Sequence, residues 1–200
     1  MTAIRYKLYK GAWINNAMPH LEQLLSKREC SDLLKKEGYL VRNIYDFDQL
    51  SSSNFWFVIK DNFGGMEELS SNTRTQVRKA LKALHIYQID KETMLEHGYS
   101  VYRAAFERYA GNQPMSEEKY IEMIENATEQ RSNGATEFFG CFLQDTGKMI
   151  AYSMNYVNED MCDYATFKAI PGCMQQYYPF YGLVYVMNNH YLHERALKYV

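Results

Sequence analysis

Residues 137–157 read EFFGCFLQDTGKMIAYSMNYV, two apolar and aromatic runs joined by a short polar turn. Asp145-Thr146-Gly147 suits a type I turn with glycine in the left-handed position, which is a common hairpin connection. After the polar residues NED, the run MCDYATFKAI continues the strand-like pattern. Consecutive strands this short pair antiparallel. The sequence therefore predicts one antiparallel meander, with strands near residues 137–143, 149–157 and 162–170.

Two helical patterns lie upstream of this meander. They are KETMLEHGYSVYRAAFERYA, residues 91–110, and SEEKYIEMIENATEQR, residues 116–131. Ser116 suits an N-cap, and acidic residues fill the turn after it. We expect helices at 93–110 and 116–131 to pack against the meander.

A further helix and a short strand are predicted before these elements. Apolar residues between 66 and 84 fall on one helical face. They are Val77, Ala80, Leu81 and Leu84. Thr73 and Gln76 have the spacing of a capping box, so the regular helix can begin as late as Thr73. Residues 85–90, HIYQID, alternate in polarity and predict a strand.

The N-terminal part of the chain is harder to read. Leucines in PHLEQLLSKRECSDLLKKEG have helical spacing, and Gly38 suits the helix end. The runs YLVRNIYDF and NFWFVIKD are β-branched and aromatic, and they predict two strands with a polar connection. We therefore divide the chain into an N-terminal extension, residues 1–63, and a main domain, residues 64–200.

Composition narrows the class of protein. A chain of 200 residues fits one domain, or one domain with an appendage. The net charge of −2 gives no overall attraction to nucleic acid or anionic membranes. No apolar run suits a signal peptide or a membrane span. The cysteines lack metal-binding spacing, which favours reduced thiols in a cytoplasmic protein. They are Cys30, Cys141, Cys162 and Cys173.

From residue 85 onward, the predicted order is strand, helix, helix, three antiparallel strands, loop and helix. This order resembles the start of the GNAT N-acyltransferase fold. Residues 55–89, FWFVIKDNFGGMEELSSNTRTQVRKALKALHIYQI, also resemble the start of the acyltransferase half of the Fem-type family. The likeness lies in a strand, a Ser/Asn/Thr-Arg cap, and Arg78-Lys79-Ala80 on a helix. Fem-type enzymes add amino acids to peptidoglycan bridges.

The resemblance covers roughly Asn54 to Val200 and concerns fold and element order. It implies an α/β (α+β) class: a GNAT-like mixed, mainly antiparallel sheet flanked by helices, with an N-terminal extension. In that fold another strand follows the last helix as a parallel neighbour of the third meander strand. We therefore expect the chain to be incomplete at its C-terminus. The open edge at 162–170 would then be covered by strands near 39–46 and 54–60, or by a second copy of the chain.

The loop between the third meander strand and the last helix is the predicted donor site. A loop that enters a helix presents free N–H groups and the positive end of the helix dipole to a phosphate. The candidate donor-binding residues are Gly172, Cys173, Met174, Gln175, Gln176, Tyr178, Tyr181 and Gly182. This loop lacks the spaced glycines of the GNAT acetyl-CoA loop. The alternative is an ordinary strand-to-helix connection whose tyrosines pack on the sheet.

No Ser-His-Asp or Cys-His set is visible, which suits direct acyl transfer without a covalent intermediate. Asp163 and Glu137 lie on predicted strands, and either is a candidate general base. The alternative is that each is a strand-end charge in contact with water. His190, His193 and Glu194 do not match a metal motif, so no metal is expected. Cys173 has no adjacent base, which argues against a catalytic thiol.

The resemblance thus implies an N-acyltransferase with acyl-CoA or aminoacyl-tRNA as candidate co-substrates and no tightly bound cofactor. The acceptor is an amine, on a small molecule or a peptide, and tRNA is a candidate partner. One alternative is a non-catalytic binding module that kept the fold and lost donor chemistry. Another is an RNA-binding protein that uses a basic stripe on one helix, although such stripes are usually solvated faces. The stripe consists of Arg74, Arg78 and Lys82, with Lys79 beside it.

Overall fold

The computed structural model describes residues 6–15, 24–43, 58–106, 113–129, 134–158 and 160–200. It divides into two compact units, Met1–Val58 and Ile59–Val200. All four cysteines are free thiols, as predicted. None of the helices in the described ranges is long and apolar enough to cross a membrane.

The first unit is a small sheet with one helix. Strands β1 (Tyr6–Tyr9) and β2 (Ala12–Asn15) form an antiparallel hairpin, and β3 (Leu40–Arg42) pairs with β2 in parallel. Helix α1 (Lys27–Lys36) begins at Ser26, whose side chain and Glu29 form a reciprocal capping box.

Two strand predictions in this region have different outcomes. The strand expected near 39–46 is present as β3, but it belongs to the sheet of the first unit and is not a strand of the meander sheet. Most of the strand expected near 54–60 lies outside the described residues, and residues 58–60 are not in a strand.

The second unit contains the predicted meander. Its four strands are antiparallel neighbours in sequence order. They are β4 (Leu84–Ile89), β5 (Ala135–Leu143), β6 (Met149–Asn158) and β7 (Met161–Ala169). Gly147 has a φ of 68°, the left-handed conformation that the hairpin turn requires. The antiparallel meander is therefore confirmed.

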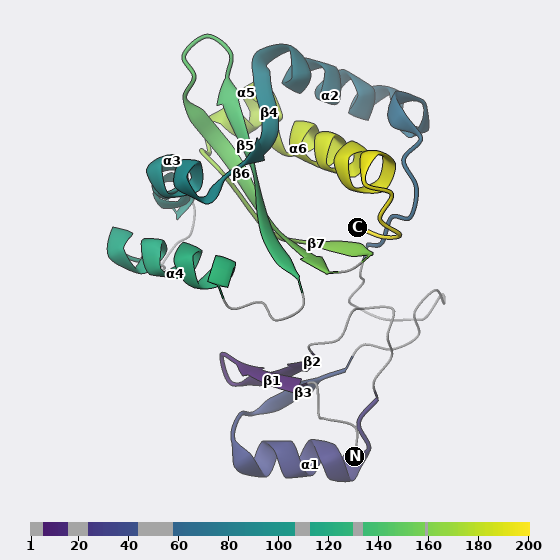
Figure 1. The fold of residues 1–200 in the computed structure, drawn as a ribbon, viewed down its shortest axis with the longest axis vertical. Helices are drawn as coiled ribbons and strands as arrows, with labels where there is room; N and C mark the ends of the chain where they lie inside the picture. The colour runs from purple at the N-terminus through teal and green to yellow at the C-terminus, as the bar shows by residue number, and fades with distance from the viewer. Residues whose placement is uncertain (1–5, 16–23, 44–57, 107–112, 130–133, 159) are drawn as a thin grey trace. The chain divides into compact units, whose positions relative to one another are not determined.

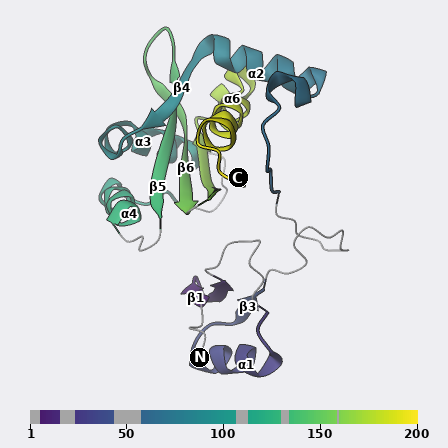
Figure 2. The ribbon, with the colours of Figure 1, turned by 45° about the vertical axis from the view of Figure 1, so that its right-hand side comes forward.

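Helices cover both faces of this sheet (Figures 1 and 2). One face carries α3 (Lys91–Ala105) and α4 (Glu117–Glu129), whose buried residues pack with Phe138 and Tyr152 of the sheet. The other face carries α2 (Ser71–Ala83) and α6 (Pro179–Asn188), which pack over Phe139 and Ile150. The helices predicted at 93–110 and 116–131 are thus confirmed as α3 and α4, and both pack against the meander. Residues 107–110 and 130–131 of these predictions lie outside the described residues.

The structure corrects two local expectations. The side chain of Ser70 accepts a hydrogen bond from the N–H of Thr73, so α2 begins at Ser71 and Thr73 is not its cap. A 3-10 turn, η1 (Gly65–Glu68), precedes it. The expected loop after β7 contains a short helix, α5 (Cys173–Tyr177), and Tyr178 in a left-handed conformation links it to α6.

Strand β7 forms the end of the four-stranded sheet. On its outer side Met161 makes a parallel bridge to Tyr199, and the N–H of Cys162 donates to the carbonyl of Tyr199 at 3.0 Å. Lys60 and Val200 exchange two backbone hydrogen bonds. Within the described ranges, no further strand pairs with β7 beyond this point. That the chain is incomplete at its C-terminus stays a prediction.

Candidate functional site

A bulge interrupts the pairing of β7 with β6. The register aligns Met154 with Thr166 and Tyr156 with Asp163, so two residues of β7 oppose one residue of β6. The two are Tyr164 and Ala165, and the single residue is Asn155. A bulge removes residues from the regular hydrogen-bond ladder, and bulges are frequent beside active sites. This one follows Asp163 directly and lies on the strand at the end of the sheet, and Asp163 itself is exposed.

A buried polar network lies under α6 beside this bulge. The side chain of Asn155 is fully buried and accepts a hydrogen bond from Ser153 Oγ at 2.5 Å. Its Nδ2 donates to Tyr191 Oη at 3.3 Å. Tyr191 in turn donates to Glu137 Oε2 at 2.9 Å. Arg195 Nη1 donates to both oxygens of Glu137, at 2.7 and 2.8 Å.

The last turn of the chain's final helix brings two members of this network into position. Residues Asn189–Glu194 form a π-helical turn, η3, and the N–H of Arg195 bonds to the carbonyl of His190 at 2.9 Å. π-helical turns are rare in proteins, and those that occur are often found at functional sites. Here the turn places Tyr191 in the core, while Arg195 lies 5.5 Å from the centroid of the Tyr191 ring and reaches Glu137.

Burial keeps the phenol and thiol groups of this region protonated. It raises the pKa of Tyr191, and the nearby Cys162 and Glu137 raise it further. Burial also raises the pKa of Tyr164, and it raises the pKa of Cys162 to about 12. At neutral pH both tyrosines therefore act as donors, and Tyr164 Oη donates to Asn188 Oδ1 at 2.9 Å.

The two predicted general bases have different surroundings. Glu137 lies on β5, its side chain is 13% exposed, and Arg195 and Tyr191 engage its oxygens. Asp163 lies on β7 at the start of the bulge and is exposed. The contacts of Glu137 thus give it a part in holding the C-terminal turn against the sheet. Its role as a base stays a prediction.

We expect Arg195→Met to lower the free energy of unfolding by about 2 kcal/mol. Breaking a buried ion pair costs roughly 3–5 kcal/mol, and the cost is smaller here because the Arg195 side chain is 34% exposed. Methionine keeps part of the apolar packing of the stem. Urea titration measures the change. Lys198→Met is the matched control, because its ion pair with Asp160 is largely exposed and such pairs contribute little to stability. Equal losses in both variants would contradict this expectation.

Seven of the eight predicted donor-site residues fall into two groups in the structure. Gly172, Gln175, Gln176 and Tyr181 are exposed. Cys173, Met174 and Tyr178 are partly buried and pack against the core under α6. Of these three, Tyr178 shows the tyrosine packing that the alternative interpretation expected.

Gly182 is a packing residue. It is buried, and a Cβ at this position would lie 2.4 Å from Ile86 Cδ1 and 3.0 Å from Ala80 Cβ. The close approach that this glycine permits is that of α6 to β4 and α2. A Cβ at Gly172 would meet nothing within 4 Å.

The basic stripe of α2 runs along the solvent side of the helix. Arg78, Lys79 and Lys82 are exposed, and Arg74 lies 3.9 Å from Glu67. Lys79 Nζ lies 5.6 Å from the ring centroid of Tyr178, so one cation of the stripe reaches the junction between α5 and α6.

The described residues give little support to a metal site or to a catalytic thiol. His190 Nδ1 lies 3.0 Å from Glu194 Oε2, and His193 is exposed. The described ranges contain no group of three or more metal-ligating side chains. Burial raises the pKa of Cys173, which opposes formation of a thiolate.

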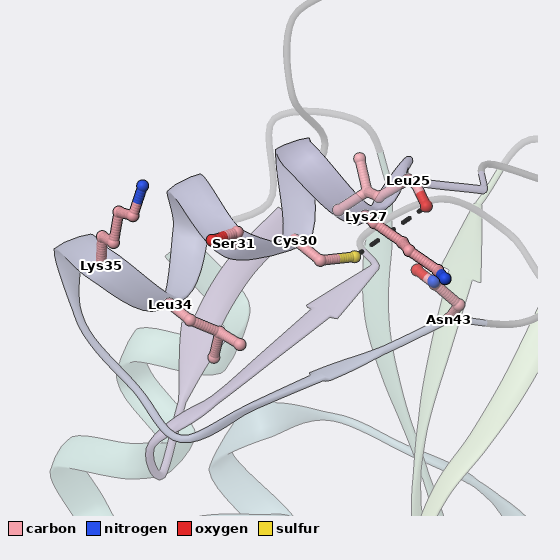
Figure 3. Close-up of a pocket in the computed structure, with 7 residues that line it drawn as sticks. All are labelled: Leu25, Lys27, Cys30, Ser31, Leu34, Lys35 and Asn43. Carbon is pink, nitrogen blue, oxygen red and sulfur yellow. Dashed lines mark hydrogen bonds between the residues drawn. The ribbon is translucent and has the colours of Figure 1, made fainter.

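Two hollows were not foreseen from the sequence. One, of about 360 Å³, lies in the second unit between α2, α6 and residues 63–69. The other, of about 570 Å³, lies in the first unit along α1 and is lined by Cys30, Leu34 and Lys35 among others (Figure 3). The hollow in the second unit is formed by segments far apart in sequence, so no local pattern could indicate it.

The arrangement of the sheet and helices agrees with a known solved structure. The crystal structure of FemX aligns with a TM-score of 0.52 and 12% identity, covering 67% of this chain and 48% of that chain. The chain has a GNAT-like fold. This confirms the fold class that the sequence predicted. The chain spans about half the length of FemX.

Two further GNAT-like structures align less well. They are the ribosomal-protein-S18-alanine N-acetyltransferase from Escherichia coli and the PaiA N-acetyltransferase from Thermoplasma acidophilum in complex with coenzyme A. The first has a TM-score of 0.40 and 20% identity, covering 57% of this chain and 62% of that chain. The second has a TM-score of 0.41 and 15% identity, covering 57% and 75%. No protein family matches the sequence, and no curated protein is a detectable relative.

Proposed function

We propose that the GNAT-like domain is an N-acyltransferase that moves an acyl or aminoacyl group directly from an activated donor to an amine. The observation that carries this proposal is the bulge at Tyr164 and Ala165, on the end strand of the sheet, beside the exposed Asp163. Backbone N–H groups released from a regular ladder can stabilise an oxyanion, because they are fixed in place before the reaction.

In the proposed reaction the amine nitrogen attacks the donor's carbonyl carbon. A C–N bond forms, and the C–S bond of a thioester or the C–O bond of an aminoacyl-tRNA ester breaks. The thiolate or ribose oxygen leaves with the bonding electrons. Asp163 accepts the proton of the amine and returns it to solvent or to the leaving group. The bulge N–H groups stabilise the negative carbonyl oxygen in the transition state.

We further propose that the donor's phosphates bind at the junction of α5 and α6. Within the described ranges no side chain caps the start of α6, and Pro179 at its first turn has no N–H. The exposed Gln175 and Tyr181 provide polar groups there, and Lys79 provides a positive charge beside Tyr178. Acyl-CoA and the 3′ end of an aminoacyl-tRNA both carry phosphates that this junction would bind.

Lys79→Gln is expected to weaken donor binding by about tenfold, the loss of roughly 1.4 kcal/mol from one charge-assisted contact. Titration calorimetry with acetyl-CoA, and separately with an aminoacylated RNA hairpin, measures the affinity and distinguishes the two donors. Lys82→Gln is the matched control, because it removes the same charge from an exposed position of the same helix, one turn further from its start. Equal affinities for the two variants would contradict the proposed phosphate site.

The second candidate function is a non-catalytic binding module. It is favoured by the packing of Cys173, Met174 and Tyr178 into the core, which leaves fewer loop groups to hold a donor. This candidate predicts that neither acetyl-CoA nor the aminoacylated hairpin binds.

A further inference from the structure

The hollow between α2, α6 and residues 63–69 has the size and lining of a ligand pocket. Its volume of about 360 Å³ is at the small end of the range for small-molecule sites. Its walls are mainly aromatic and aliphatic, including Phe63, Tyr181, Val184 and Tyr185. The rings of Phe63 and Tyr185 meet edge to face, with centroids 5.3 Å apart. Such a lining favours an aromatic ligand, because rings pack well against rings.

One carboxylate lines this pocket. Glu68 Oε2 accepts hydrogen bonds from Lys60 Nζ at 2.7 Å and from the N–H of Gly64 at 3.1 Å. Among the described residues, Oε1 of Glu68 has no hydrogen-bond partner. Burial raises the pKa of Glu68, but the hydrogen bonds from Lys60 and Gly64 outweigh this effect and hold the pKa below its usual value. Oε1 is therefore an ionised acceptor that can receive one donor from a ligand.

The charges around Glu68 select a neutral ligand. Lys60 already compensates the carboxylate, so a ligand ammonium would lie beside a second positive charge. A ligand anion would face Glu68, and no Lys or Arg of the described ranges lines the pocket. A neutral N–H or O–H group is repelled neither by Lys60 nor by Glu68, and it gains a hydrogen bond to a charged acceptor.

We propose that this pocket binds a small, neutral, aromatic molecule with a single N–H or O–H donor, which donates to Glu68 Oε1. The ring of the ligand packs against Phe63 and Tyr185. The pocket shares Tyr181 with the proposed donor site at the α5–α6 junction, but ligand binding in it does not depend on acyl transfer. It adjoins the bulge, because Asn188 both lines the pocket and accepts the hydrogen bond from Tyr164.

Four probes with one ring system test the ligand class. Indole has the N–H donor, 1-methylindole lacks it, tryptamine adds a positive charge and indole-3-acetate adds a negative charge. Titration followed by protein NMR gives each dissociation constant. Indole is expected to bind about tenfold more tightly than 1-methylindole, the effect of one hydrogen bond to a charged group. Both charged probes are expected to bind more weakly than indole. Equal affinities for indole and 1-methylindole, or tighter binding of either charged probe, would overturn the proposal.

Three variants locate the site. Val184→Trp fills the pocket with a side chain at a position that is 37% exposed, so it should remove indole binding while the protein stays folded. Glu68→Gln should reduce the preference for indole over 1-methylindole from about tenfold to about threefold, because a neutral acceptor makes a weaker bond. Glu67→Gln is the matched control, since Glu67 is the preceding residue of η1 and its side chain is 92% exposed. The proposal is wrong if Glu67→Gln changes the preference as Glu68→Gln does, or if Val184→Trp binds indole normally. Circular dichroism checks the fold of each variant.

Discussion

Asp163→Asn is expected to lower the rate of acyl transfer by about a hundredfold. A positioned general base contributes roughly 10²–10⁴-fold to a reaction rate, and asparagine keeps the size of the side chain while losing its basicity. Because Asp163 precedes the bulge on an exposed part of β7, the substitution should leave the fold and the donor affinity unchanged. Single-turnover release of CoA or of deacylated RNA, at saturating donor, measures the rate.

Two other carboxylates serve as comparisons for Asp163. Asp145→Asn changes an exposed carboxylate in the β5–β6 turn, and its rate should equal that of the unmodified protein. Glu137→Gln should lower stability, because Arg195 and Tyr191 both engage that carboxylate. A full rate in Asp163→Asn together with a large loss in folded Glu137→Gln would reverse the assignment and make Glu137 the base.

Gly182→Leu is expected to lower the free energy of unfolding by about 2–3 kcal/mol. The new Cβ would lie 2.4 Å from Ile86 Cδ1, and the rest of the side chain would force α6 away from α2 and β4. Overpacking of this kind costs typically 1–3 kcal/mol, occasionally more. Leucine has a better helix propensity than glycine, which stabilises the variant by roughly 1 kcal/mol. This gain offsets part of the steric cost of the substitution. Urea titration measures the loss.

Gly172→Leu is the matched control for this experiment. Both glycines flank the predicted donor loop, but a Cβ at Gly172 meets nothing within 4 Å and its φ is −62°. Its stability should stay within about 0.5 kcal/mol of that of the unmodified protein. If Gly172→Leu were the more harmful substitution, the packing role of Gly182 would be refuted.

Local patterns were sufficient to predict the meander and the helices that pack on it. The turn Asp145-Thr146-Gly147 and the apolar runs on each side act over a few residues, and the structure keeps both. The cap of α2 was misassigned because Ser70 and Thr73 are both good caps, and sequence spacing does not tell which hydroxyl faces the first free N–H groups.

The candidate site could be predicted only in part. Asp163 and Glu137 were chosen for their chemistry, but Arg195, which engages Glu137, lies 58 residues away in the sequence. The bulge depends on a register between two strands, and the pocket beside Glu68 depends on contacts between α2 and α6. A glycine at a helix start permits close approach, and the sequence does not reveal which group approaches Gly182.

The π-helical turn η3 makes the number of residues near the C-terminus as important as their identity. The bond from the N–H of Arg195 to the carbonyl of His190 spans one residue more than an α-helical bond. Loss of any one residue between 189 and 194 would return the turn to α-helical geometry and rotate the segment after it by about 100°. Arg195 would then point away from Glu137, and the pairing of Tyr199 with Met161 would slip by one position. Among natural variants of this chain, single-residue deletions in the turn should therefore be rarer than substitutions at the same positions.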